Sequence, residues 1–390
     1  MNYKFSYKVP NLKPNSNTLS DNDTIIFSSD MPSGEPFAFD AIKRIGFDVM
    51  SENPDNIINI GKAEGYEPLR IFLRGLLFQK NIIGEHDGVV LLNCFCEALD
   101  LICRTLTDDG DTVICEEPVA NDILNVFRLN GLKVIGVPLN NDGLDLDRLH
   151  SALIKYPSTK FIFTTPNFQN PTGITLSEEK REEIYSIAHK YDTAIIENDL
   201  YCDLRFQGAD MPSIKSFDKE GRVIYLSGFE SILYPFSKTA YICADTLLLS
   251  KLSLTKGVYL SQANTFEQVV IKRFFDEFDY FDYTFKLSGY YRSKCETMLS
   301  HLQFELPTSI SFTEPEGGFF IMGTLPIGTD VNRFCKLMLD RKISLSPVTE
   351  FLINDKNISN SFRLNFSVPS EEQIIKGIKI LGEASKLLAL

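Results

Sequence analysis

Apolar runs of four or five residues recur along the chain, and residues that favour turns lie between them. The runs are apolar at successive positions rather than at every second one, which is typical of strands covered by helices on both faces. They predict seven strands, over Gly88–Leu92, Thr112–Cys115, Lys133–Val137, Lys160–Phe163, Thr193–Ile196, Val223–Leu226 and Ala240–Cys243.

Segments with helical periodicity separate several of these runs. In the segment 176–191, Ser177 can cap the N-terminus, and Ile184, Ile187, Ala188 and Tyr191 share one face. Strands that alternate with helices predict an α/β fold with a mostly parallel sheet between two helical layers.

The length of 390 residues favours two domains. A helical pattern over 280–302 predicts a bridge to a smaller domain. We therefore expect an N-terminal segment (1–45) that packs on the small domain, a large domain (46–285), and a small C-terminal α/β domain (286–390).

Composition excludes some partners and settles little else. The net charge of −13 argues against a nucleic-acid partner, and no apolar run is long enough to span a membrane. The N-terminus lacks the apolar core of a signal peptide, and the eight cysteines form no regular framework. These features predict a cytoplasmic protein with free thiols. The four histidines show no ligand spacing with the cysteines, so we expect no metal site.

Six sequence blocks follow one another in an order that carries a family resemblance. They are Gly65-Tyr-Glu-Pro-Leu-Arg70, Asp109-Gly-Asp-Thr-Val113 with Glu116-Glu-Pro118, Pro166-Asn-Phe-Gln-Asn-Pro-Thr-Gly173, Glu197-Asn-Asp-Leu-Tyr201, Pro315-Glu-Gly-Gly318 and Phe362-Arg-Leu-Asn-Phe-Ser367. The set resembles fold-type I aminotransferases that depend on pyridoxal phosphate (PLP), and most closely the aminoadipate/kynurenine subgroup. The resemblance implies a seven-stranded large domain, a small C-terminal domain and a two-fold dimer.

The segment from Val223 to Tyr241 resembles the part of these enzymes that carries the cofactor lysine. In one register the lysine position holds Ser231 and a following arginine position holds Lys238. Serine cannot form the Schiff base that holds PLP. This register is favoured because Ser231 lies thirty residues after Tyr201, as the family's lysine does. In the other register Lys238 is itself the Schiff-base lysine.

Other cofactor positions also depart from the family pattern. At the position where the family has an aspartate that pairs with the pyridine nitrogen, this chain has Asn198, which carries no charge. At the position of the family's aromatic lid it has Ala120. The resemblance places a partner-subunit tyrosine at Ile60.

The expected phosphate site departs too. The family holds phosphate at a helix N-terminus, and this chain has Cys94, Phe95, Cys96 and Glu97 there. Phe95 is bulky and Glu97 adds like charge. Lys238 offers a point charge where the family has an arginine fork.

Three positions match the family. Asn170 and Tyr201 correspond to residues that contact the cofactor ring oxygen or the substrate, and Arg363 to the residue that binds the substrate carboxylate. Each also has a structural interpretation: Asn170 as part of a turn, Tyr201 as packing and Arg363 as an ion-pair residue.

The residues suggest several chemistries for the altered pocket. Cys94 would lie at a helix N-terminus, which favours a thiolate, although inert buried cysteine is the commoner case. Glu97 and Glu230 could form an acid/base pair beside Ser231.

Three functional hypotheses follow. The first, which we expected, is a repurposed enzyme without any cofactor that acts on a small carboxylate-bearing substrate held by Arg363, Asn170 and Lys238. The second is a non-catalytic subunit that pairs with an active paralogue instead of forming a homodimer. The third is a PLP-dependent aminotransferase that uses Lys238.

Overall fold

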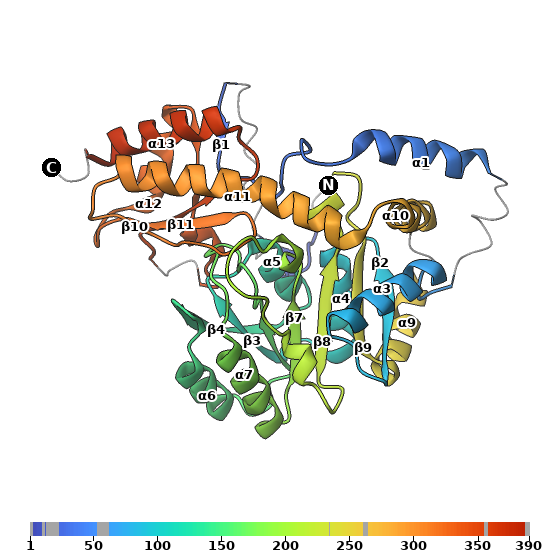
Figure 1. Ribbon diagram of the computed structural model, residues 1–390. Helices are drawn as coiled ribbons and strands as arrows, with labels where there is room; N and C mark the ends of the chain where they lie inside the picture. The colour runs from blue at the N-terminus through green and yellow to red at the C-terminus, as the bar shows by residue number, and fades with distance from the viewer. Residues whose placement is uncertain are drawn as a thin grey trace.

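The computed structural model describes residues 3–9, 12, 23–52, 62–233, 235–259, 264–354 and 358–386. Its largest element is an eight-stranded sheet with the order β2-β9-β8-β7-β6-β3-β4-β5 (Figure 1). The strands are β2 (Asp87–Leu92), β3 (Thr112–Glu117), β4 (Lys133–Asn140), β5 (Gly143–Leu144), β6 (Phe161–Thr164), β7 (Ala194–Asn198), β8 (Val223–Gly228) and β9 (Ala240–Asp245).

The seven strands that the apolar runs predict are all present, and the expected α/β fold is confirmed. The eighth strand, β5, is a two-residue strand that folds back on β4. The neighbouring pairs from β8 through β7, β6 and β3 to β4 are parallel. Strand β9 is antiparallel to both β8 and β2, so β2 and β8 run in the same direction.

Helices cover both faces of this sheet. Helices α4 (Phe95–Leu106), α5 (Asn121–Leu129) and α9 (Thr246–Tyr259) pack with one face of the strands. Helices α6 (Leu146–Lys155) and α7 (Glu178–Lys190) cover part of the other face. The cap predicted at Ser177 is present, because its side chain accepts a hydrogen bond from the backbone N–H of Lys180.

A smaller four-stranded antiparallel sheet has the order β10-β11-β14-β13. Its strands are β10 (Ser311–Phe312), β11 (Phe320–Thr324), β13 (Ser346–Pro347) and β14 (Ser361–Asn365). The remaining helices are α1 (Phe39–Ser51), α3 (Glu67–Gln79), α8 (Glu230–Leu233), α10 (Thr265–Glu277), α11 (Tyr280–Glu305), α12 (Val331–Asp340) and α13 (Glu371–Lys386), with short 3-10 turns η2 (Cys202–Leu204), η3 (Ile214–Phe217) and η4 (Val348–Phe351). The long helix α11 passes from the large sheet to the small one, as the pattern over 280–302 predicts (Figure 1).

The N-terminal segment joins the small sheet region through a short parallel ladder. Strand β1 (Ile25–Ile26) pairs with β12 (Ile343–Ser344). Phe27 extends this contact, because its N–H donates to Ser344 O at 2.9 Å and its carbonyl accepts from Asn365 N–H at 2.8 Å. These bonds attach the chain around Phe27 to the small sheet region. That the whole segment 1–45 packs there, and the bounds of the three parts, stay predictions.

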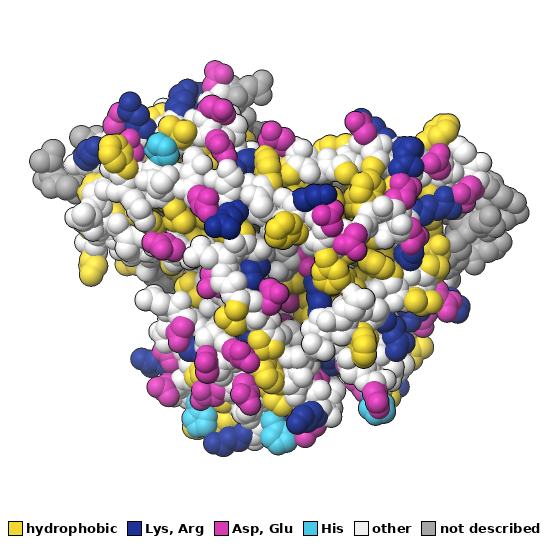
Figure 2. Space-filling model, in the orientation of Figure 1, with side chains coloured by type: hydrophobic (Ala, Val, Ile, Leu, Met, Phe, Trp, Pro, Cys, Tyr) yellow, Lys and Arg dark blue, Asp and Glu magenta, His cyan; other side chains and the backbone are white. Residues whose placement is uncertain are grey.

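The surface in Figure 2 carries acidic and basic side chains side by side, with apolar side chains between them, both singly and in small groups. Within the described ranges, no helix has both the length and the apolar character needed to cross a bilayer.

Candidate active site

A cavity of about 340 Å³ lies at the carboxyl ends of the strands of the large sheet. Chain segments that follow β2, β3, β6, β7 and β8 all reach it, and open α/β sheets bind their ligands at this edge. The lining also includes the N-terminal segment and the turn η4. Its residues are Asp30, Met31, Cys94, Phe95, Cys96, Ala120, Asn121, Asp122, Asn170, Leu200, Tyr201, Glu230, Lys238, Glu350 and Phe351.

The structure brings eight of the twelve predicted site residues to this cavity. They come from six separate segments of the sequence and are Cys94, Phe95, Cys96, Ala120, Asn170, Tyr201, Glu230 and Lys238. Their convergence gives the predicted pocket a location, while the role of each residue stays a prediction.

The other four predicted residues do not line the cavity. Ser231 is buried in α8, and its hydroxyl donates to Leu200 O at 2.6 Å, so the chain itself engages that hydroxyl. Asn198 is buried and donates to Thr165 Oγ1 at 3.2 Å. That Ser231 stands at the family's lysine position stays a prediction, and Ile60 lies outside the described residues.

Glu97 was predicted as half of an acid/base pair with Glu230, but it does not line the cavity and its carboxylate has a partner in the chain. The Glu97 carboxylate accepts the backbone N–H of Asn93 at 2.8 Å, while its own N–H donates to Cys94 Sγ at 3.4 Å. These two bonds form a reciprocal cap at the start of α4. Glu97 therefore caps the helix, and its pairing with Glu230 stays a prediction.

The cysteines are also unsuited to nucleophilic chemistry. All eight are free. Burial raises the pKa of the Cys94 thiol despite its place at a helix N-terminus, because desolvation outweighs the backbone hydrogen bond from Glu97. The pKa of the Cys96 thiol is also raised, mainly by burial and to a smaller extent by the nearby Asp122 carboxylate. Burial therefore outweighs the helix-terminus effect at Cys94, which favours the interpretation of an inert buried cysteine.

Arg363 lies in β14, fully buried, directly behind the cavity wall. Its Nη1 donates to Asp30 Oδ1 at 2.6 Å and to Asn170 Oδ1 at 2.8 Å. The guanidinium is held between the rings of Phe320 and Phe351, at 4.6 Å and 4.9 Å from their centroids. The predicted carboxylate-binding group therefore already holds a carboxylate, and that carboxylate belongs to the chain.

Sequence reasoning missed three acidic lining residues, Asp30, Asp122 and Glu350. Asp122 follows the Glu116-Glu-Pro118 block by four positions and lies in the first turn of α5, so its place could have been inferred. Asp30 and Glu350 carry no local signal, because only the folded chain brings the N-terminal segment and η4 to this edge.

The acidic lining changes the protonation of the cavity groups. Burial raises the pKa of Glu230 to about 7, Lys238 opposes this shift, and Asp122 adds to it. Lys238 Nζ lies 3.7 Å from Glu230 Oε1. Burial and the surrounding carboxylates also raise the pKa of the Tyr201 phenol, so it stays protonated.

The Asn-Pro-Thr-Gly turn has a structural role beside any contact with a ligand. Gly173 has φ +73°, and a Cβ there would lie 2.4 Å from Phe320 O, so only glycine fits this close approach. Because Phe320 lies in β11, the turn joins the large sheet to the small one while Asn170 faces the cavity.

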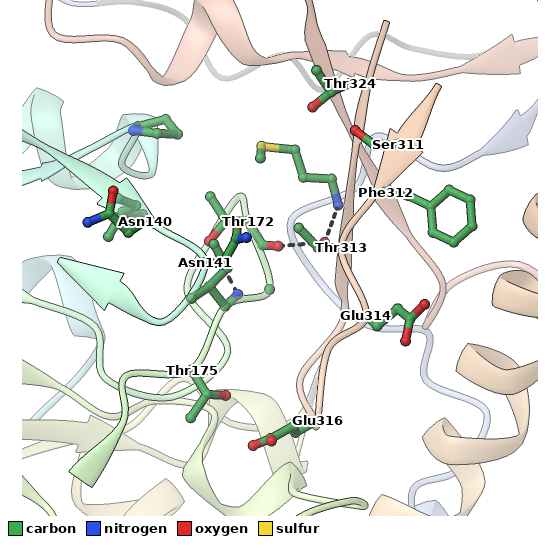
Figure 3. Close-up of a pocket in the computed structure, with 15 residues that line it drawn as sticks. Asn140, Asn141, Thr172, Thr175, Ser311, Phe312, Thr313, Glu314, Glu316 and Thr324 are labelled. Carbon is green, nitrogen blue, oxygen red and sulfur yellow. Dashed lines mark hydrogen bonds between the residues drawn. The ribbon is translucent and has the colours of Figure 1, made fainter. Parts of the chain in front are cut away.

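A larger cavity of about 570 Å³ lies on the other side of this turn (Figure 3). Thr313 Oγ1 donates to Thr172 O at 2.8 Å across it. Its described lining offers amides, hydroxyls and two glutamates, Glu314 and Glu316, but no lysine or arginine. We place the candidate site in the smaller cavity because the predicted residues converge there.

Comparison with known families identifies the chain. The model of aminotransferase class I and II matches residues 59–381. The chain belongs to this family. It is 30% identical to aromatic-amino-acid aminotransferase 1 of Thermococcus litoralis over 93% of this chain and 88% of that protein.

Two solved structures of family members contain cofactor forms. The kynurenine aminotransferase of Pyrococcus horikoshii, in complex with PMP, has a TM-score of 0.92 and 29% identity, covering 99% of this chain and 98% of that one. The α-aminoadipate aminotransferase of Thermus thermophilus, complexed with N-(5'-phosphopyridoxyl)-L-leucine, has a TM-score of 0.86 and 26% identity, covering 94% and 93%. The expectation that this protein uses no cofactor is therefore wrong: its family and these relatives indicate PLP.

The residues around the cavity fit PLP in part. Lys238 supplies an amine at the cavity, Tyr201 a phenol and Asn170 an amide, and the N-terminus of α4 lies there, with the Cys94 thiol accepting the N–H of Glu97. Asn198 and Ala120 provide neither a charge for the ring nitrogen nor a stacking surface. Across the described part of the chain, no three His, Cys, Asp or Glu side chains gather as a metal ion would require.

Proposed function

We propose that the protein is a PLP-dependent aminotransferase in which Lys238 supplies the amine that binds the cofactor. The observation that carries the proposal is that Lys238 is the one lysine among the described lining residues of the cavity. The net reaction exchanges an amino group and a hydrogen on one carbon for the oxygen of a carbonyl on another, so it needs no outside oxidant.

PLP, when bound, supplies an aldehyde and an electron-withdrawing ring. The chain's own residues then have to manage protons. An amine reacts with an aldehyde only when it is neutral, so Lys238 has to release a proton. Glu230 lies 3.7 Å away, and because its pKa is raised to about 7 it can take up and return that proton near neutral pH.

The same carboxylates predict weak binding of the cofactor phosphate. Asp122 and Glu230 line the cavity beside the start of α4, and Glu97 occupies the N–H of Asn93. Each acts against a phosphate dianion. We therefore expect a lower affinity for PLP than in relatives that have an arginine fork at this site.

The test is to titrate the purified protein with PLP, reduce it with borohydride and locate the phosphopyridoxyl group by peptide mass spectrometry. We expect the label on Lys238 and its loss in Lys238→Ala. Lys251→Ala, at a lysine outside the cavity, is the matched control. A label on another lysine, or no label at saturating PLP, would overturn the proposal.

The family's substrates are amino and keto acids, and its members are commonly dimeric. We infer a two-fold homodimer here as well, and light scattering of the purified protein tests that inference. Copurification of a second, homologous chain would instead favour the paralogue hypothesis.

A further inference from the structure

The terminal N–H groups of Arg363 all have acceptors within the chain. Each of the two terminal nitrogens carries two hydrogens. Those of Nη1 go to Asp30 Oδ1 at 2.6 Å and Asn170 Oδ1 at 2.8 Å. Those of Nη2 go to Ser28 O at 2.8 Å, Ser29 O at 3.2 Å and Ser346 Oγ at 3.3 Å. The Nε–H of Arg363 is buried and has no acceptor among the described residues, so a ligand carboxylate that binds the two terminal nitrogens has to displace one of these groups.

Asp30 holds its place through several neighbours. It lies three residues after Phe27, whose N–H and carbonyl are both bonded to the small sheet region. The carbonyl of Ser29 also accepts from Asn365 Nδ2 at 2.9 Å. The segment just before Asp30 is thus held by the main-chain bonds of Phe27 and by the Asn365 side chain. Its own side chain is 38% exposed, on the side that lines the cavity.

The charge balance of the cavity points the same way. Four carboxylate residues line it, Asp30, Asp122, Glu230 and Glu350. The cations beside them are Lys238 in the lining and Arg363, which is bonded to Asp30. The pKa values of Asp122 and Glu230 are both raised, mainly by burial, and nearby carboxylates add to each shift. A ligand with an ammonium group relieves this repulsion, whereas a ligand carboxylate increases it.

We propose that Asp30 occupies the place of a substrate α-carboxylate on Arg363, so that the cavity selects a primary amine without an α-carboxylate over an α-amino acid. The selection concerns binding alone; that the bound amine then loses its amino group rests on the function proposed above. Asp30 is thereby a specificity-determining residue.

Two probes that differ only in the carboxylate test this selection: 2-phenylethylamine and phenylalanine. Isothermal titration of the protein as isolated gives a dissociation constant for each. We expect the amine to bind at least tenfold more tightly. In Asp30→Ala the guanidinium gains a free N–H and the cavity loses a negative charge, so we expect the ratio to reverse in favour of phenylalanine.

Asp30→Asn keeps an oxygen acceptor for Arg363 and removes only the charge. It should weaken 2-phenylethylamine binding without the full gain in phenylalanine binding, and it carries the test if Asp30→Ala does not fold. Glu220→Ala is the control, since it removes a carboxylate that pairs with Arg222 at 2.9 Å beside the start of β8, away from the cavity. It should leave the ratio unchanged.

Tighter binding of phenylalanine by the wild-type protein would overturn the inference, because Asp30 would then yield to a substrate carboxylate. An unchanged ratio in both Asp30 variants would also overturn it. These results are separate from the borohydride test. If the protein binds the amine selectively but no lysine is labelled, only the proposed function is contradicted. If Lys238 is labelled but phenylalanine binds more tightly, only this inference is contradicted.

Discussion

Arg181 and Arg363 are both fully buried, and they are satisfied in different ways. Arg181, on α7, donates to Leu176 O at 3.1 Å, Pro212 O at 2.9 Å, Pro166 O at 2.9 Å and Asn167 Oδ1 at 2.8 Å. All four acceptors are neutral. Arg363 has neutral acceptors and one carboxylate, Asp30, which borders a cavity.

The difference separates an arginine that fastens loops from one that faces a ligand site. Burial lowers the pKa of Arg181, since no carboxylate is bonded to it to offset the lost hydration. Such an arginine is retained for the backbone oxygens that it ties together. Arg363 instead shares its fork with a carboxylate that also borders the cavity, so this pair lies where a ligand in the cavity would meet it.

The largest expected effect is on the Arg181 side of this comparison. Arg181→Met removes four hydrogen bonds. Leu176 O and Pro212 O lose these donors, whereas Pro166 O keeps the N–H of Leu176 and Asn167 Oδ1 keeps Arg205 Nη2. We expect a loss of about 4 kcal/mol in the free energy of unfolding. Urea unfolding monitored by circular dichroism measures it, with the exposed Lys190→Met on the same helix as control. An equal loss in the control would remove the structural role assigned to Arg181.

The second prediction concerns the burial of the Glu230 carboxyl. The pKa of Glu230 is about 7 in the folded chain, above its ordinary value of 4.5. Folding therefore favours the protonated form; the stability from this proton is present below pH 4.5 and is lost as the pH rises through 7. Glu230→Gln should raise the free energy of unfolding at pH 8 by up to about 3 kcal/mol, with no gain at pH 4. A gain that does not change with pH would show that the Glu230 carboxylate is hydrated.

A smaller loss of stability is expected from Arg363→Met. Asp30 is part-exposed and can turn to water in the cavity, so we expect a loss of about 2 kcal/mol, half that of Arg181→Met. The variant should also bind 2-phenylethylamine and phenylalanine with a ratio unlike that of the wild type, whereas Arg181→Met, measured at a temperature where it is folded, should keep the ratio. Equal losses of stability in the two variants would erase the distinction between the two arginines.

The smallest effect is expected from Ser346→Ala. Its hydroxyl accepts from Arg363 Nη2 at 3.3 Å and donates to Ser28 O at 3.2 Å, both long bonds. We expect the free energy of unfolding, measured by thermal denaturation, to fall by about 0.5 kcal/mol or less. The ratio of 2-phenylethylamine to phenylalanine binding should not change. A changed preference would mean that Nη2, and not only Nη1, takes part in recognition.

The large sheet could be predicted from the sequence because its strands are apolar on both faces and stand out as continuous runs. The cap at Ser177 and the helix over 280–302 could also be predicted, because each depends on residues close together in the sequence. The two-residue strands β1, β5 and β12 carry too few side chains for any pattern, and they form only because neighbouring strands supply their hydrogen-bond partners.

The site could be predicted only as far as local motifs extend. Asn170, Tyr201 and Glu230 lie next to motif blocks, and they meet at the carboxyl edge of the sheet as the fold requires. Asp30 is 333 positions from Arg363, and no local pattern joins them. The cap formed by Glu97 was missed for the same reason, since the motif gave its position but not the backbone N–H of Asn93 that it accepts.

The cage around Arg363 also has a temporal consequence. A ribosome releases the strand-forming β1 segment and Asp30 first, and the β14 strand that carries the guanidinium is among the last parts to emerge. Until then Asp30 has no guanidinium to bond, although β12, which emerges earlier, can already pair with β1. The cage around Arg363 can therefore form only once β14 has been made, and a chain that stops before β14 lacks it.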